Sequence, residues 1–101
     1  MAPDAEPQWL VYMLRCADGS LYTGVTTDLC RRLHEHNCSR HGARYTRARR
    51  PVQVVHLEPA ANRSAACRRE YQLKRMTRAA KEKLLQRHDE PFSSLDEKAT
   101  L

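Results

Sequence analysis

Glycine is scarce in this chain, with only three copies among 101 residues. Nucleotide-binding proteins commonly grip phosphates with loops that hold several closely spaced glycines. Three glycines at positions 19, 24 and 42 cannot build such a loop, so these nucleotide-binding fingerprints are excluded. Long apolar runs are also missing, and no stretch approaches the roughly 20 apolar residues that a membrane-spanning helix needs.

Paired cysteines are absent as well. The chain has four cysteines, at positions 16, 30, 38 and 67, but no Cys-x-x-Cys motif. Structural zinc sites usually draw on such paired ligands, so zinc is a minor alternative, kept open by the Cys and His residues between positions 30 and 41. The polar, acidic N-terminus has no apolar signal core. We therefore expect a cytoplasmic protein with free thiols.

Charge is spread unevenly along the chain. Residues 1–88 hold 17 Lys and Arg against 8 Asp and Glu, a net charge of +9, whereas residues 89–101 carry −3. We expect one domain over residues 9–88, preceded by a flexible arm at 1–8 and followed by a flexible acidic tail at 89–101. A basic body indicates a polyanionic partner, most simply nucleic acid, either DNA or RNA.

The stretch from Leu10 to Asn37 predicts a strand, a turn, a second strand and a helix. Asp18-Gly19 between two runs of β-branched, aromatic and aliphatic residues is a strong hairpin signal. Capping oxygens then precede the helix at residues 26–28. The predicted elements are strands at 10–15, 21–25 and 51–57, and helices at 29–37, 65–76 and up to about 87. The fold class is therefore α+β.

Five side chains are candidates for chemistry. Tyr12 and Tyr22 lie on the facing strands, while Arg32 and His36 share one face of the following helix. Glu70 falls inside the apolar arc of a later helix, where a carboxylate is costly without compensation. Each residue also has an ordinary structural interpretation: tyrosines are common in sheets, most arginines are solvated, and Glu70 could form a partly buried salt bridge to a neighbouring arginine.

Together these residues resemble the GIY-YIG nuclease family, in particular its small stand-alone bacterial members of the UPF0213 type. Leu10-Val11-Tyr12 matches the first motif, with Leu in place of the leading Gly, and Tyr22-Thr23-Gly24 matches the second. The resemblance covers about residues 9–86 and includes Arg32 and His36. It implies a three-stranded antiparallel sheet flanked by about three helices, with Glu70 as the single metal-binding glutamate.

The resemblance implies a metal-dependent endonuclease that hydrolyses phosphodiester bonds in DNA, as DNA repair requires. In this interpretation Glu70 binds Mg²⁺, with Mn²⁺ as a substitute, and Arg32 stabilises the negative charge of the phosphate. Tyr12 and Tyr22 position water or phosphate. The general base stays open between Tyr12, the usual candidate in the family, and His36, whose ordinary pKa is near neutrality.

The segment from residue 37 to 50 is predicted to be a loop that contacts nucleic acid. It holds five arginines, and a loop of this length is uncommon in a compact domain without a function. The predicted contact residues are Arg40, Arg44, Tyr45, Arg47, Arg49 and Arg50. No additional DNA-reading domain is evident, which predicts weak sequence preference and recognition through the backbone and strand shape. A non-catalytic binding module, a subunit of a larger repair complex and a homodimer remain alternatives.

Overall fold

The computed structural model of this protein describes residues 7–86. The predicted arm and tail lie outside these residues, apart from Pro7 and Gln8. The elements, in chain order, are β1 (Trp9–Cys16), β2 (Leu21–Thr26), α1 (Leu29–Cys38), α2 (Arg44–Arg47), β3 (Val52–Ala60) and α3 (Arg63–Arg75). Residues 78–86 are also helical.

The three strands form one antiparallel sheet in the order β2-β1-β3, so β1 is central and the other two are edges. The turn between β1 and β2 contains Gly19 with φ of 85°, the left-handed conformation for which the Asp18-Gly19 signal selects glycine. The predicted α+β class with a small antiparallel sheet is confirmed.

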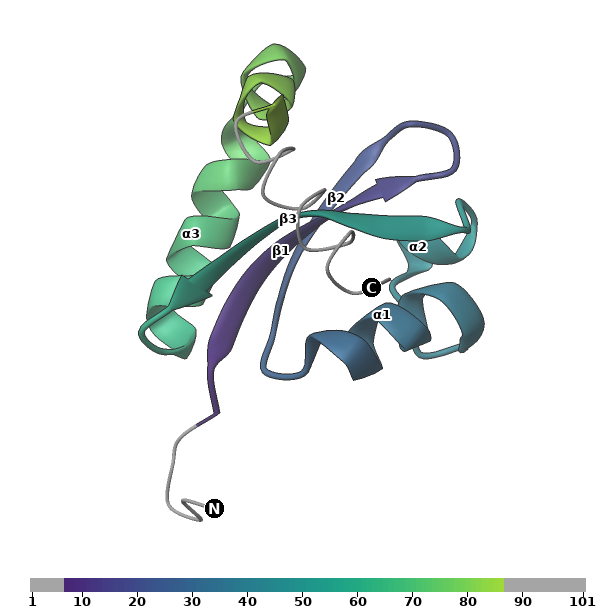
Figure 1. Cartoon of the computed structure of the whole chain (residues 1–101), viewed down its shortest axis with the longest axis horizontal. Coiled ribbons are helices and arrows are strands. Elements are labelled where there is room, and N and C mark those ends of the chain that lie inside the picture. Colours follow the sequence, from purple (N-terminus) through teal and green to yellow (C-terminus); the bar gives the residue numbers. More distant parts are fainter. Residues whose placement is uncertain (1–6, 87–101) are drawn as a thin grey trace, which may run out of the picture.

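The two faces of the sheet are covered by different helices (Figure 1). Successive residues of β1 point to opposite faces, as in any strand. Val11 and Met13 pack with the α3 residues Ala66 and Leu73 and with Leu85 of the last helical segment. The opposite layer holds Tyr12, Leu14, Cys16 and Val52, against which Leu29 and Leu33 of α1 pack. We call these two sides the α3 face and the α1 face.

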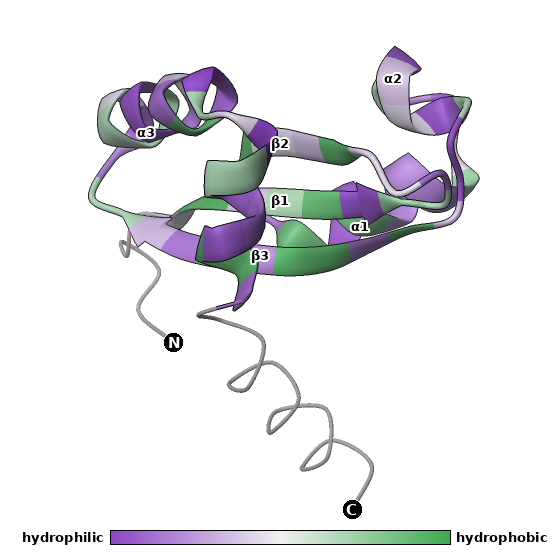
Figure 2. Cartoon of the chain, turned by 90° about the horizontal axis from the view of Figure 1, so that it is seen from above, coloured by the Kyte–Doolittle hydropathy of each residue, from purple (hydrophilic) through white to green (hydrophobic). Residues whose placement is uncertain are grey.

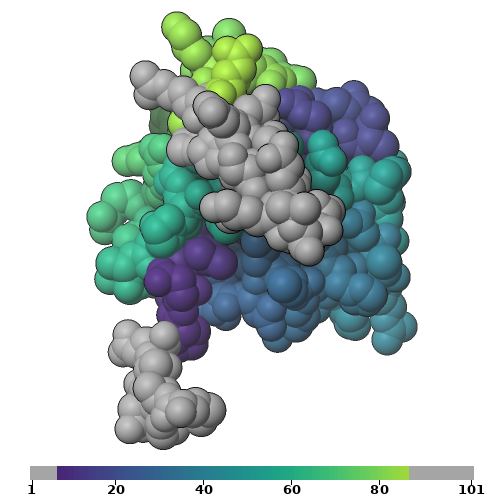
Figure 3. All heavy atoms as spheres, in the orientation of Figure 1, coloured from purple at the N-terminus to yellow at the C-terminus, as the bar shows by residue number. Residues whose placement is uncertain are grey.

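The edge formed by β2 lies between two helices that are far apart in sequence. Seen from above, α3 and α2 flank this edge, one toward each end of the strand (Figure 2). The space-filling view places the α1–α2 segment and α3 on different sides of the molecule (Figure 3). The sheet edge is therefore where residues of both faces can approach each other.

The structure departs from the prediction most clearly in β3 and in the segment between α1 and β3. β3 continues past the predicted residue 57 to Ala60 and includes Pro59, which an edge strand tolerates because one side of it donates no ladder hydrogen bond. The predicted loop contains the short helix α2. The predicted capping residues are confirmed: the side chain of Asp28 accepts from Arg31 N at 3.1 Å, and that of Asn62 accepts from Ala65 N at 2.8 Å. Helix α3 begins at Arg63, two residues before the predicted start.

An ion-pair cluster fastens the last helical segment to the hairpin. Both oxygens of Glu82 accept from Arg15, at 2.7 and 3.1 Å, and Arg78 donates to Glu82 at 2.8 Å. The hydrogen bonds from Arg15 and then from Arg78 hold the pKa of Glu82 at about 2. Within the described residues no helix has the length and apolar character needed to cross a bilayer.

Candidate active site

Tyr12 reaches the β2 edge across a glycine. Tyr12 pairs with Gly24 in the β1–β2 register, and its side chain is 1% exposed. A Cβ atom placed on Gly24 would lie 2.5 Å from the Tyr12 hydroxyl and 2.6 Å from its Cζ. The phenol therefore occupies space that only glycine leaves open, and the two motif residues depend on each other sterically.

A buried chain of polar side chains continues from this phenol. The Tyr12 hydroxyl lies 2.8 Å from Nε2 of His36, and Nδ1 of His36 lies 2.8 Å from Oγ1 of Thr46. Thr46 Oγ1 in turn donates to the carbonyl of Ala43 at 2.9 Å. His36 and Thr46 are both fully buried. The chain thus joins β1, α1 and α2 without contact with solvent.

Burial keeps both ends of the first hydrogen bond neutral. Burial, together with the nearby Tyr22, raises the pKa of Tyr12 to about 12, although Arg32 acts against the rise. Burial, together with the positive charge of Arg32, lowers the pKa of His36 to about 4. At neutral pH the pair is therefore a phenol and an uncharged imidazole.

Arg32 is held beside Tyr12 by two contacts of its own. Its Nη1 donates to Glu35 Oε1 at 3.0 Å and to the carbonyl of His41 at 2.8 Å. Its guanidinium also acts on the phenol of Tyr12, because it opposes the rise of the Tyr12 pKa through a hydrogen bond and its charge. The side chain is 25% exposed, so this cation is positioned but still open to a ligand.

Tyr22 belongs to a group of rings that leads toward α2. Its ring centroid lies 6.4 Å from that of Tyr12, 5.2 Å from that of His36 and 6.1 Å from that of Tyr45. Arg49 covers the Tyr45 ring, with its Cζ 4.0 Å from the centroid. Tyr45 thus stacks on Tyr22 and contacts Arg49, while the residue remains 39% exposed.

Glu70 comes to the same region from the other face. Ala66 and Leu73 mark the buried side of α3, and at 100° per residue Arg69 and Glu70 lie about 50° to either side of it. Arg69 binds Glu58 of β3 at 2.8 Å, so Glu70 lies on the flank toward β2. The carboxylate is 23% exposed, lies 3.3 Å from Nζ of Lys74, and its charge adds to the rise of the Tyr12 pKa.

The structure therefore brings four of the candidate side chains together around the β2 edge and places the fifth, Glu70, near enough for its charge to act on the pKa of Tyr12. The five side chains are Tyr12 of β1, Tyr22 of β2, Arg32 and His36 of α1, and Glu70 of α3. The prediction of a salt bridge at Glu70 also holds in form, although its partner is Lys74 and not an arginine. An ion pair with Lys74 and a bound metal ion would therefore use the same carboxylate of Glu70.

The predicted nucleic-acid residues divide into three groups. Arg40, Arg44 and Arg47 are exposed around α2. Arg49 pairs with Asp18 at 3.1 Å and stacks on the Tyr45 ring.

Arg50 lies apart from these residues. Its guanidinium donates to the carbonyls of His36 at 2.6 Å, Glu35 at 3.1 Å and Ser39. These carbonyls belong to the end of α1, where backbone acceptors lack partners within the helix. Arg50 therefore caps the carboxyl end of α1.

Comparison with known proteins places the chain in a family. The family model of the GIY-YIG catalytic domain matches residues 8–84. The chain belongs to the GIY-YIG family. Membership indicates a nuclease fold, and nucleases with this domain generally use divalent metal ions.

Within this family, the chain is similar to several UPF0213 proteins. It is 48% identical to one from Desulfotalea psychrophila over 89 residues, which cover 88% of this chain and 81% of that protein. It is 54% identical to one from Haloquadratum walsbyi, with 73% of this chain and 82% of that protein covered. The solution NMR structure of an E. faecalis protein matches with a TM-score of 0.56 at 38% identity, covering 82% of this chain and 88% of that one.

Two residues of this GIY-YIG site were missed by sequence reasoning as site residues. Gly24 was noted only as a letter of the motif, although its lack of a Cβ is what admits Tyr12. Thr46 lies among the arginines of the predicted loop, and nothing in the local sequence points to a buried partner. Only its fully buried position and its contact with His36 single it out.

The site offers one carboxylate to a cation. Among the described residues, no three His, Cys, Asp or Glu side chains lie close enough to hold a metal ion together, and the cysteines at positions 16, 30, 38 and 67 are free thiols. One carboxylate with water and phosphate oxygens suits Mg²⁺, which keeps several of its waters. Glu70 fits this use, because it is partly exposed and already faces the cation of Lys74.

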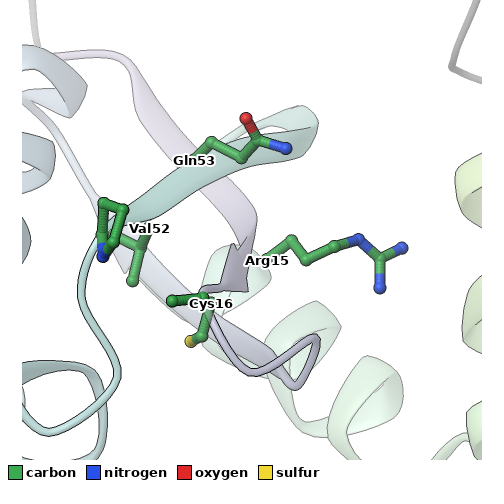
Figure 4. A pocket seen from close by; sticks show the side chains of 6 residues that line it. Arg15, Cys16, Val52 and Gln53 are labelled. Carbon is green, nitrogen blue, oxygen red and sulfur yellow. The ribbon is translucent and has the colours of Figure 1, made fainter.

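A cavity of about 250 Å³ lies elsewhere, at the turn end of the hairpin and the start of β3 (Figure 4). Arg15, Cys16, Val52 and Gln53 are among the residues that line it. None of the five candidate side chains does. The candidate active site is therefore at the β2 edge and not in this cavity, because all five candidate side chains lie outside it.

Proposed function

We propose that this protein is a divalent-metal-dependent endonuclease that hydrolyses phosphodiester bonds in DNA, in the service of DNA repair. Recognition would depend on the DNA backbone and strand shape, with weak sequence preference. The observation that carries the proposal is the convergence of two phenols, one guanidinium and one carboxylate at the β2 edge, although they come from four elements and both faces of the sheet.

Phosphodiester hydrolysis builds up negative charge on the phosphate, and Arg32 is suited to stabilise it. A guanidinium stays charged at all working pH values and presents a planar fork to phosphate oxygens. The contacts of Nη1 with Glu35 and His41 fix the orientation of this fork before substrate binds. Such preorganised charge costs little reorganisation when the transition state forms.

Glu70 would hold the Mg²⁺ ion, which supplies further charge stabilisation at the phosphate and the leaving oxygen. Lys74 contacts the same carboxylate at 3.3 Å, so a bound divalent ion would replace this lysine as the partner of Glu70. Two exposed arginines of α2, Arg44 and Arg47, together with Arg40, would contact phosphates on either side of the cleaved bond.

The proton of the attacking water would go to Tyr12 and not to His36. His36 is fully buried, and both its ring nitrogens have partners, so it can act only through the phenol. Tyr12 is protonated, with a pKa of about 12, so it can accept a proton only as it passes its own to His36 Nε2.

The test is cleavage of labelled single-stranded, branched and duplex DNA in Mg²⁺ or Mn²⁺, with matched RNA strands alongside. Arg32→Ala and Glu70→Gln should each slow cleavage by about 100-fold or more, as expected for loss of a charge that stabilises the transition state. Glu58→Gln is the matched control. The Glu58 carboxylate is also 23% exposed, but it belongs to β3 and pairs with Arg69 on the other flank of α3. This variant should cleave like the wild type.

If Arg32→Ala and Glu70→Gln cleave as fast as the wild type, the site assignment is wrong.

A second candidate function is a non-catalytic nucleic-acid-binding module. It is supported by the exposed arginines around α2, which could bind nucleic acid without the catalytic residues. Salt-sensitive DNA binding without cleavage in any divalent metal would favour that function.

A further inference from the structure

The hydrogen bonds of Thr46 determine which nitrogen of His36 carries the proton. A threonine hydroxyl has one hydrogen to donate. Thr46 Oγ1 donates it to the carbonyl of Ala43 at 2.9 Å, and a carbonyl can only accept. At the His36 contact of 2.8 Å, Oγ1 is therefore the acceptor and Nδ1 must carry the hydrogen. Neutral imidazole then has an unprotonated Nε2.

The direction of the next hydrogen bond follows. An unprotonated Nε2 accepts, so the Tyr12 hydroxyl is the donor across 2.8 Å. The order of donors is then Tyr12 to His36, His36 to Thr46, and Thr46 to the backbone of Ala43. All three side chains are at most 1% exposed, so solvent does not compete for these hydrogen bonds.

We propose that Thr46 is a positioning residue, which holds His36 in the Nδ1–H tautomer and so keeps Nε2 ready to take the proton of Tyr12. The consequence for cleavage rests on the proposed function. The tautomer itself does not, because it is a property of the folded protein without substrate. In the opposite tautomer, Nε2–H would donate to the phenol oxygen, and Tyr12 could not pass its proton to His36.

The backbone around Thr46 holds its hydroxyl in place. The carbonyl of Ala43 accepts both from Thr46 Oγ1 and from Arg47 N, at 2.9 and 3.0 Å, so the short helix α2 closes around the threonine. The preceding residue, Tyr45, stacks on Tyr22. Two consecutive residues of α2 therefore reach both candidate tyrosines, one directly and the other through His36.

Two variants separate the role of the Thr46 hydroxyl from that of its bulk, and a third serves as a control. Thr46→Val keeps the shape but removes the acceptor, whereas Thr46→Ser keeps the hydroxyl. Thr77→Val is the control: Thr77 Oγ1 accepts from Ala80 N at 3.1 Å, at the start of the last helical segment, so this variant also loses a hydroxyl hydrogen bond. Thr77 belongs to no part of the proposed site.

The first measurement is the nitrogen NMR spectrum of the imidazole side chains in ¹⁵N-labelled protein without DNA. Wild type, Thr46→Ser and Thr77→Val should show His36 protonated on Nδ1. Thr46→Val should show a substantial share of His36 protonated on Nε2, because its Nδ1–H has lost its acceptor. An unchanged tautomer in Thr46→Val, with the fold retained, overturns the proposal.

The second measurement is single-turnover cleavage with protein in excess. Thr46→Val should lower the rate about tenfold, the cost of one hydrogen bond of about 1.4 kcal/mol, and leave DNA affinity unchanged. Thr46→Ser should restore the rate, and Thr77→Val should not lower it. Equal rates for Val and Ser at position 46 would overturn the role in catalysis. If the wild type cleaves no DNA, the proposed function fails, but the NMR result still decides the role of Thr46.

Discussion

The α3 face and the α1 face of the sheet bury polar groups in different ways. On the α3 face, Glu58 lies between His56 Nε2 at 2.6 Å and Arg69 Nε at 2.8 Å, and this charged group joins β3 to α3. On the α1 face, Tyr12, His36 and Thr46 are linked by hydrogen bonds between uncharged groups, and the chain ends beside the candidate site.

The two faces therefore contribute differently: the α3 face mainly to stability, and the α1 face mainly to the chemistry of the candidate site. Most of the α3 face is apolar, and the ionic contact of Glu58 fixes how α3 lies against β3. The α1 face instead places neutral donors and acceptors in a line, which is cheaper to bury than charge and defines a direction for proton transfer.

The largest predicted effect concerns two neighbouring residues of β1, whose side chains point to opposite faces of the sheet. Met13 and Leu14 are both fully buried, so Met13→Ala and Leu14→Ala should each lower the free energy of unfolding by about 3 kcal/mol. Leu14 packs in the layer of Tyr12 and Tyr22, whereas Met13 packs with α3. Only Leu14→Ala should also slow cleavage by the folded molecules. Urea denaturation and cleavage assays well below the transition measure the two effects.

Equal loss of cleavage in both variants would show that the two faces are not independent. In that case, loss of packing on the α3 face would also disturb the site, most directly through the position of Glu70.

The next effect concerns the space above Tyr12. Gly24→Ala should reduce the cleavage rate about 100-fold, because the new Cβ must displace the phenol by a distance on the order of 1 Å. Gly19→Ala is the matched control. Gly19 has φ of 85° but no atom within 4 Å of an added Cβ, so this change should cost about 1 kcal/mol of stability through backbone strain and leave cleavage intact. Full activity in Gly24→Ala would contradict the role of this close contact.

The smallest predicted effect is the pH dependence of stability that originates on the α1 face. His36 has a pKa of about 4 in the folded protein and an ordinary value near 6.5 when unfolded, so between these values the unfolded chain binds more protons. Acid therefore favours unfolding, and His36 should account for about 2 kcal/mol of lost stability between pH 7 and pH 5. Urea denaturation at both pH values should show a smaller difference for His36→Gln.

Much of the fold could be predicted from the sequence because its signals are local. The Asp18-Gly19 turn, the caps at Asp28 and Asn62 and the alternating strands each depend on a few adjacent residues, and the structure confirms them. Helix α2 was missed because four residues are too few for a periodic pattern. The end of β3 was misplaced because Pro59 ends most strands and is tolerated only at an edge.

The candidate side chains could be found from their order and spacing, but their roles could not. Residues 12 and 36 are 24 positions apart, and whether His36 faces water or Tyr12 depends on how α1 packs on the sheet. Arg50 looked like any other arginine of its segment, and only the path of the chain turned it toward the carbonyls at the end of α1.

By itself, the sequence determined a basic α+β domain with two tyrosines, an arginine, a histidine and a glutamate in a GIY-YIG order. Only the tertiary structure decided that the glutamate of one face lies near enough to act on the pKa of Tyr12 on the other face, and that Thr46 is the hydrogen-bond partner of His36. The physical reason is that strand and helix signals act over a few residues. The direction of a buried hydrogen bond instead depends on every donor and acceptor that packing brings together.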